Sequence, residues 1–437
     1  MLHIIPDNKF KTASLAFYFS IPLQDKCEIT AYSLLSKVLQ RGSLGYPKTS
    51  DLDKRLQELY GAVFDSGVAK RGEAQVVYFR FEFLSDRYAG NNPSVPTLRG
   101  SAGILNNNVS TKCGATSPSP ERHDASILRD IIALAKDIIW TPRQFNKDYI
   151  EQEKANLEEF IAGQINDKRS YAARRLVEIM CEGENYAFSE DGYAEELPKL
   201  TPKVLEMTHG ELLKKPFEVF AGGDIAEEDV RALLEQAIPE VSQVREPFLA
   251  VDCFLGGGAN ITATERQNIT QSKLAMGFST GITARDSEFA ALTVYNGVFG
   301  GGATSLLFNN VRERLSLCYY VGTRLDRFKG LMILGAGIEN DKFEVAKNEI
   351  LTQEARMRSG DFSDGELEAA KLSIINSYKS MLDSQAAVEE FRLRQILSGE
   401  SAGIDEVIEG IRAVSREDVT RVARRVKLET TYLLTNN

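Results

Sequence analysis

Three side chains near the N-terminus, Ser33, Ser36 and Lys37, place two hydroxyls and an ammonium group on one expected helix. A lysine can activate a serine nucleophile in the S-x-x-K spacing of serine acyl-enzymes. Here Lys37 follows Ser33 by four residues and Ser36 by one, so neither serine has that spacing. An ammonium group repels a divalent cation and a serine hydroxyl is a poor zinc ligand. The segment is therefore not expected to hold a metal ion.

Histidine and cysteine are too sparse or too scattered for an obvious zinc site elsewhere. The three histidines, His3, His123 and His209, lie far apart in the sequence. The five cysteines form no C-x-x-C pair, which indicates neither a thiolate zinc site nor a disulfide framework. We expect buried or half-buried thiols in a reducing compartment.

The composition is that of a soluble globular protein with more than one core. The chain has 437 residues, 43% of them hydrophobic and 26% charged, which predicts two or more domains. A net charge of −10 argues against sequence-independent nucleic-acid binding. The sequence contains no run of 18 apolar residues, so no membrane span is predicted. Residues 13–23 alternate between apolar and smaller or polar side chains, as in a strand, and are not interpreted as a signal peptide. These features favour a cytoplasmic protein.

The pattern predicts an α+β fold of two homologous domains, each a mostly antiparallel sheet with helices packed on it. We expect an N-terminal domain over residues 1–238, a linker over 239–247 and a C-terminal domain over 248–437. Residues 91–126, rich in Asn, Ser, Thr, Pro and Gly, are interpreted as an inserted or disordered loop.

The elements of the first half alternate between strands and helices. Thr30 is expected to cap a helix through residue 40, and Ser50 to cap a helix over 51–59. The expected strands are 2–6, 10–21, 62–69, 74–84 and 217–222. Further helices are expected at 127–140, 146–163, 170–181, 202–213 and 227–237.

The second half repeats this plan, with a helix, a tyrosine and then a hairpin in both halves. The expected strands are 248–254, 273–278, 318–325, 331–338 and 430–434. The expected helices are 287–299, 305–315, 342–358, 364–382, 388–398 and 416–426.

Four segments carry a resemblance over nearly the whole chain. They are Gln40-Arg41-Gly42-Ser43, Leu56 to Ala62 (LQELYGA), Gly300 to Phe308 (GGGATSLLF) and Val311 to Tyr319 (VRERLSLCY). In these the chain resembles the pitrilysin/insulinase peptidases, whose zinc site has the signature H-x-x-E-H. The resemblance implies two similar domains joined by a linker. It is strongest to a bacterial subgroup associated with aminopentanol modification of translation elongation factor P (EF-P).

The resemblance also identifies degenerate metal positions. Matched on Gly42, the two histidines and the glutamate of H-x-x-E-H fall at Ser33, Ser36 and Lys37. The family's distal zinc glutamate falls at Phe160, with Glu159 one residue away. The resemblance therefore implies a non-catalytic member that carries no metal of its own.

A second pair of residues has the opposite implication. In active assemblies of the family, an Arg and a Tyr with the spacing of Arg312 and Tyr319 hold the substrate backbone and stabilise an oxyanion. Tyr320 is an alternative in register for Tyr319. Without the resemblance, Arg312 reads as a solvated charge beside Glu313, and Tyr319 as the first residue of a strand.

Two other features favour structural roles. The runs Gly256-Gly257-Gly258 and Gly300-Gly301-Gly302 lack the following Lys-Ser or Lys-Thr of a phosphate loop and are expected to form turns, the second of which could border the substrate chamber. The acidic residues Glu182, Glu184, Glu190 and Asp191 are expected to be solvated surface.

The favoured hypothesis is a non-catalytic subunit of a heterodimeric zinc metallopeptidase. An H-x-x-E-H sister chain would hold the zinc and act on a peptide or protein substrate, while this chain supplies Arg312 and Tyr319. No cofactor, nucleic acid or membrane is expected for this chain itself. The alternatives are an inactive scaffold or peptide-binding protein without a catalytic partner, and a serine acyl-enzyme that uses Ser33 or Ser36.

Overall fold

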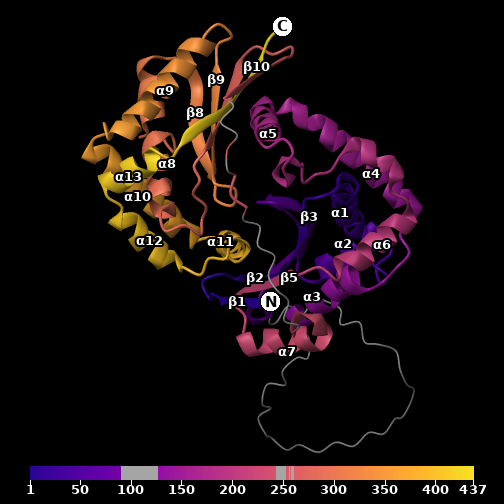
Figure 1. Ribbon diagram of the computed structural model, residues 1–437. Helices are drawn as coiled ribbons and strands as arrows, with labels where there is room; N and C mark the ends of the chain where they lie inside the picture. The colour runs from indigo at the N-terminus through magenta and orange to yellow at the C-terminus, as the bar shows by residue number, and fades with distance from the viewer. Residues whose placement is uncertain (90–125, 243–251, 255, 257–259) are drawn as a thin grey trace, which may run out of the picture.

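Two five-stranded sheets organise the chain, as the computed structural model in Figure 1 shows. The structure describes residues 1–89, 126–242, 252–254, 256 and 260–437. The expected loop at 91–126 lies, except for Ser126, outside the described residues, as do residues 243–247 of the expected linker. Residues Pro239–Ser242 form a short 3₁₀ helix, η6.

The two sheets have the same topology. The first has the order β1 (Leu2–Pro6), β5 (Phe217–Gly223), β2 (Thr12–Pro22), β4 (Ala74–Leu84) and β3 (Val63–Arg71). The second has the order β6 (Ile261–Arg266), β10 (Lys427–Thr435), β7 (Ser272–Ser279), β9 (Leu331–Ile338) and β8 (Cys318–Asp326). In both sheets, the strand that comes first in the sequence pairs in parallel with the strand that comes last, β1 with β5 and β6 with β10. The other pairs are antiparallel. The α+β fold and its internal repeat are confirmed.

Both faces of the first sheet are covered, which explains the almost continuous burial of β2. Leu15, Phe17 and Phe19 point into the main core, whereas Ala16 and Tyr18 join a second cluster on the opposite face. The period-two pattern of this strand therefore separates two buried faces rather than a buried face and a wet one.

Helices cover the sheets in two groups. Those of the first half are α1 (Lys26–Leu39), α2 (Thr49–Glu58), α3 (Ile127–Ala135), α4 (Lys147–Gly163), α5 (Lys168–Met180), α6 (Pro202–Leu212) and α7 (Glu227–Ala237). Those of the second half are α8 (Phe289–Phe299), α9 (Phe343–Ser359), α10 (Asp364–Met381), α11 (Gln385–Ser398), α12 (Ile404–Ala413) and α13 (Arg416–Ala423).

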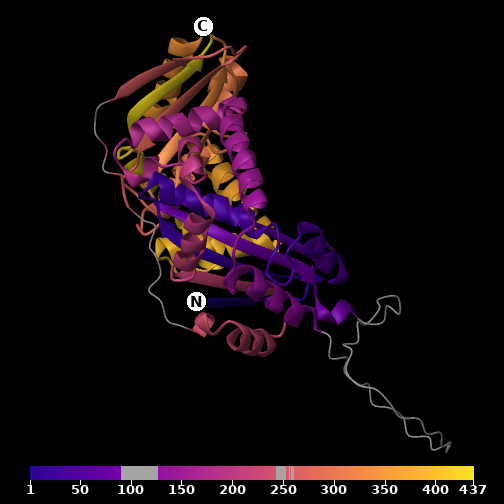
Figure 2. The same cartoon turned by 90° about the vertical axis from the view of Figure 1, so that its right-hand side faces the viewer.

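The two halves exchange one helix each. Helix α5 of the first half packs on β7 and β10 of the second sheet, and α11 of the second half packs on β5 of the first sheet (Figure 1). Figure 2 shows α5 crossing the strands of the second sheet. Leu176 of α5 is buried against this sheet, as is Leu393 of α11 against the other. The exchange brings the second face of each sheet into contact with the opposite half.

Several expected elements are wrong in detail. Helix α1 is capped by Asp25, whose carboxylate accepts from the Glu28 N–H, because the helix begins a full turn before Thr30. Helix α2 starts at Thr49 after Lys48, so Ser50 is not its cap. Of the strand expected at 248–254, the described residues Asp252 to Phe254 are not in a strand. Strand β6 and helix α12 were not predicted from the sequence.

Two helical segments widen locally into π-helix. The helix expected at 127–140 continues from α3 as a π-helical segment, η2 (Lys136–Trp140). The segment expected at 305–315 is also π-helical, η7 (Leu307–Arg314), and it carries Arg312. No helix among the described residues is long and apolar enough to cross a membrane.

Candidate functional site

The degenerate metal positions lie inside a packed contact between α1 and β3. Ser33 is 2% exposed and Ser36 is 0% exposed. The Ser36 hydroxyl donates to the Ser33 carbonyl at 2.8 Å, and the Ser66 hydroxyl donates to the Ser36 carbonyl at 2.8 Å. The Lys37 ammonium donates to the Ser66 carbonyl at 3.4 Å. These groups fasten the helix to the strand.

This arrangement argues against a serine acyl-enzyme. Lys37 donates to a backbone carbonyl rather than to either serine, and the Ser36 hydroxyl is committed to the turn before it. A nucleophile must also be reachable by its substrate. The hypothesis of a nucleophilic Ser33 or Ser36 is therefore wrong.

The distal position on α4 does not complete a metal site either. Phe160 is 55% exposed, and Glu159 is exposed beside it. The buried carboxylate of this helix is Glu153, which accepts from the Arg41 guanidinium and the Asn156 amide. The residues at these positions do not fit a zinc ion, which needs deprotonated N, O or S ligands converging on one point.

Both histidines that the structure describes already have polar partners within the chain. His3 contacts Glu218 at 2.7 Å and stacks on Phe220. His209 is hydrogen bonded to the Ile139 carbonyl at 2.7 Å, and burial lowers its pKa. His123 lies outside the described residues.

A cavity of about 1200 Å³ lies between the two halves. Its walls come from the end of β3, helix α5, strand β7 and strand β8. Strands β3 and β8 each lie at one of the two edges of their sheets, so each has one side that no described strand covers. The cavity therefore offers two sheet edges to an extended chain.

The second glycine run borders this cavity. The Gly300 carbonyl accepts from the Thr323 N–H of β8 at 3.0 Å. A Cβ at Gly300 would lie 2.7 Å from the Thr323 hydroxyl and 2.8 Å from Leu307. Glycine is needed because the turn approaches β8 closely. The expectation that this run forms a turn beside the chamber agrees with its position.

The lining of the cavity is basic although the chain is acidic. Eight basic and three acidic side chains line it, against a net charge of −10 for the whole chain. The basic residues are Lys70, Arg71, Arg169, Arg174, Lys273, Arg324, Arg327 and Arg394. Charge of one sign inside a cavity attracts ligands of the opposite sign.

Three members of the expected acidic surface, Glu184, Glu190 and Asp191, are partly buried instead. Burial, followed by repulsion from Glu190, raises the pKa of Asp191 to about 6, and the Asp191 carboxylate accepts from the Gln164 amide at 2.5 Å. Glu184 pairs with Lys329 at 2.6 Å. The interpretation of Glu184, Glu190 and Asp191 as solvated surface is wrong, because each is only partly exposed.

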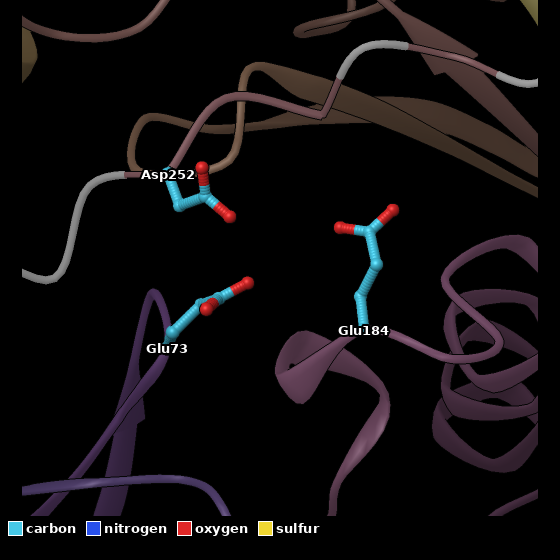
Figure 3. A group of neighbouring side chains, drawn as sticks. All are labelled: Glu73, Glu184 and Asp252. Atoms are coloured by element: carbon cyan, nitrogen blue, oxygen red, sulfur yellow. The ribbon is translucent and has the colours of Figure 1, made fainter.

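Lys329 joins the two halves through three carboxylates. It lies in the turn between β8 and β9, is 1% exposed, and contacts Glu73 at 2.6 Å, Glu184 at 2.6 Å and Asp252 at 3.1 Å. Figure 3 shows these carboxylates converging from three separate segments. They are spaced closely enough for a metal ion. The ammonium group of Lys329 already supplies the positive charge there.

Arg312 and Tyr319 share a separate hollow of about 400 Å³ with Glu313 and Glu339. The Arg312 side chain is 40% exposed, lies over the Phe308 ring at 4.6 Å and is 3.6 Å from Glu313. Tyr319 is 60% exposed. The structure thus brings this pair together, but neither residue lines the interdomain cavity, whereas Tyr320 does.

Comparisons with known proteins place these features in a family context. Residues 214–374 match the family described as "Peptidase M16 inactive domain". The chain is 29% identical to "Probable inactive metalloprotease YmfF" of Bacillus subtilis over 446 aligned positions, which cover 99% of this chain and 95% of the relative.

Solved structures give the same picture of the fold. A conserved protein from Enterococcus faecalis superposes with a TM-score of 0.82 at 27% identity, over 100% of this chain and 96% of that one. A structure described as a peptidase M16 inactive domain from Pseudomonas fluorescens superposes with a TM-score of 0.75 at 15% identity, over 100% of this chain and 96% of that one.

Proposed function

Because the chain is a non-catalytic member of the M16 peptidases, the pitrilysin/insulinase family, we propose that it is one subunit of a heterodimeric zinc metallopeptidase. Its sister chain would carry H-x-x-E-H and the zinc ion. This chain would close the substrate chamber and contribute Arg312 and Tyr319.

The observation that carries the proposal is the set of contacts that α1 makes through the residues at the degenerate metal positions. Ser33, Ser36 and Lys37 stand where the family has its zinc ligands and general base, and here their polar atoms hold α1 to β3. The fold is thus retained while the metal site is replaced by helix–strand contacts. A chain of this kind can still shape and close a chamber for a partner.

Arg312 and Tyr319 support the second half of the proposal. Both are accessible in one hollow, and the only carboxylate in ion-pair distance of Arg312 among the described residues is its neighbour Glu313 at 3.6 Å. A guanidinium and a phenol can both donate to a substrate carbonyl or to an oxyanion. Their exposure leaves them available to a site on another chain.

The test is a co-purification with an H-x-x-E-H sister chain encoded beside it, followed by a peptide-cleavage assay. We expect zinc in the partner only, and a loss of kcat of roughly 100-fold for Arg312→Ala or Tyr319→Phe, as for other oxyanion donors. Arg314→Ala is the matched control, because Arg314 is an exposed arginine on the same segment. Unchanged turnover in both variants would remove the proposed role.

A second candidate is a peptide-binding scaffold that needs no catalytic partner. The cavity of about 1200 Å³ favours it, because this cavity is formed within one chain. The two candidates differ in gel filtration with the sister chain: stable co-elution supports the subunit, and separate elution of a peptide-binding monomer supports the scaffold.

The cellular association proposed for the chain is with modification of EF-P in the cytoplasm. It rests on the subgroup resemblance. Deletion of the gene followed by mass spectrometry of EF-P tests it, and an unchanged mass of the modified EF-P would end it.

A further inference from the structure

Two cations of the interdomain cavity share one aromatic ring. The guanidinium of Arg169, on α5, lies 4.5 Å from the centre of the Tyr320 ring, and the ammonium of Lys273, on β7, lies 5.7 Å from it. Neither cation has a carboxylate within ion-pair distance in the described part of the chain. Asp167 is near in sequence, but its carboxylate caps α5 by accepting from Arg169 and Ser170 N–H groups.

Three other basic residues of the cavity are paired with carboxylates. Arg71 pairs with Glu390 at 2.7 Å, and Arg394 pairs with the same carboxylate at 2.6 Å. Arg327 holds both oxygens of Glu400 at 2.8 and 2.9 Å. These pairs neutralise one part of the wall and leave Arg169 and Lys273 as an uncompensated cluster.

The uncompensated cluster has an electrostatic cost. Burial, followed by repulsion from Arg169, lowers the pKa of Lys273. Asp167 offsets part of this repulsion, but two cations with no carboxylate in ion-pair distance remain unfavourable for the free protein. An anion bound between them would relieve that repulsion and gain charge-assisted hydrogen bonds.

The sheet beneath the cluster leaves room for a ligand. Lys273, Gly337 and Tyr320 are cross-strand neighbours on β7, β9 and β8. The next row along the same face contains Gly335 opposite Gly322, and a Cβ built at Gly335 would meet no atom within 4 Å. A backbone can therefore approach the sheet next to the cations.

Arg324 extends the positive charge along the same strand. It lies four residues after Tyr320 on β8, hence on the same face, and it is exposed to the cavity without a carboxylate in ion-pair distance among the described residues. Four residues of a strand span about 13 Å, so Tyr320 and Arg324 are spaced for an extended chain rather than for one small anion.

We propose that this cavity selects acidic peptide segments, whose carboxylates are received by Arg169, Lys273 and Arg324. The proposal rests on the proposed role in peptide handling and adds a substrate class to it. A peptide is favoured over a small anion because the cavity, at about 1200 Å³, exceeds the usual small-molecule pocket of about 300–1000 Å³. Apart from Thr323, whose N–H already donates to the Gly300 carbonyl, the edges of β3 and β8 that no described strand covers can also pair with its backbone.

The test compares a short fluorescein-labelled peptide rich in glutamate with its glutamine counterpart, by fluorescence anisotropy on the full chain at fixed ionic strength. We expect the glutamate peptide to bind roughly tenfold more tightly. The double variant Arg169→Gln/Lys273→Met should lose this preference. Arg424→Gln/Lys427→Met removes the same charge from exposed positions outside the cavity and should retain it.

Each of the other outcomes contradicts a specific part of the proposal. Equal binding of both peptides overturns acidic selectivity and leaves the peptide-binding role intact. Failure of both to bind overturns both ideas. If inorganic phosphate, compared with chloride at equal ionic strength, displaces the peptide completely at millimolar concentration, the site is a small-anion site instead. Arg169→Gln alone, at an exposed residue, gives the same answer should the double variant not fold.

Discussion

Two lysines near the boundary between the halves, Lys329 and Lys273, have opposite surroundings. Lys329 is almost completely buried and touches three carboxylates, whereas Lys273 is half-buried, touches none and faces Arg169. Burial works to lower the pKa of Lys329, but its hydrogen bonds to Glu184, Glu73 and Asp252 outweigh burial and raise it. At Lys273 nothing outweighs burial, and the pKa is lowered.

The difference separates a structural cation from a binding cation. The charge of Lys329 is satisfied within the chain and joins segments of both halves, so it serves the fold. The ammonium group of Lys273 donates to the Gln271 side-chain oxygen but has no carboxylate within ion-pair distance among the described residues, so a bound anion can stabilise it. Clusters of like charge that persist in a cavity are candidates for ligand sites for this reason.

The largest expected effect is on Lys329. Lys329→Met should lower the free energy of unfolding by about 3 kcal/mol, because it leaves three carboxylates together without a counter-charge. The contribution of Lys329 is complete at neutral pH, below the unfolded pKa of about 10.4, and is lost only as pH rises through the higher folded pKa. Urea unfolding followed by circular dichroism measures the loss.

Two variants test the cause of that loss. Lys203→Met, at an exposed lysine on α6, should change stability little. Adding Glu73→Gln to Lys329→Met should restore part of the stability, since it removes one of the repelling charges. A loss below about 1 kcal/mol in Lys329→Met would place this cluster among ordinary surface ion pairs and remove the contrast with Lys273.

The matching change at the other lysine should have a much smaller effect. Lys273→Met should leave the free energy of unfolding within about 0.5 kcal/mol of the parent, because loss of packing is offset by relief of repulsion from Arg169. Since the folded pKa of Lys273 is lowered, its cost is present at neutral pH and disappears as pH rises through that value. The same urea titration decides the outcome. A loss as large as that of Lys329→Met would make Lys273 a structural cation.

The sequence predicted the repeated fold because its signals are local. Alternation along residues 10–21 and 74–84, and the helix–Tyr–hairpin unit in both halves, follow from short-range periodicity. The errors had two sources, an overlooked local cap and a contact between distant segments. The start of α1 depends on Asp25 rather than on Thr30, and Glu184 is drawn to a lysine far along the chain.

The candidate sites divide in the same way. Residue types alone argued against a zinc site at Ser33, Ser36 and Lys37, because an ammonium group repels the ion and serine hydroxyls are poor zinc ligands. The Arg169–Lys273–Tyr320 cluster joins three elements from both halves, and no spacing in the sequence indicates it. The glycines at 335 and 337 in a buried strand were its one visible signal, since glycine in a strand often marks a close approach.

The smallest expected effect concerns pH and Asp191. At pH 7.5 the Asp191 carboxylate is charged and opposes an acidic peptide in the cavity, whereas at pH 5.5 it is mostly protonated, since its pKa is raised to about 6. Glutamates of the peptide stay ionised at pH 5.5, and no histidine lines the cavity in the described part of the chain. Removing one charge on the order of 10 Å away should tighten binding about twofold. Asp191→Asn should bind with the tighter affinity at both pH values in the anisotropy assay. If Asp191→Asn shows the same pH dependence of peptide binding as the parent, that dependence belongs to another group. Asp191 then does not modulate binding to the basic residues of the cavity.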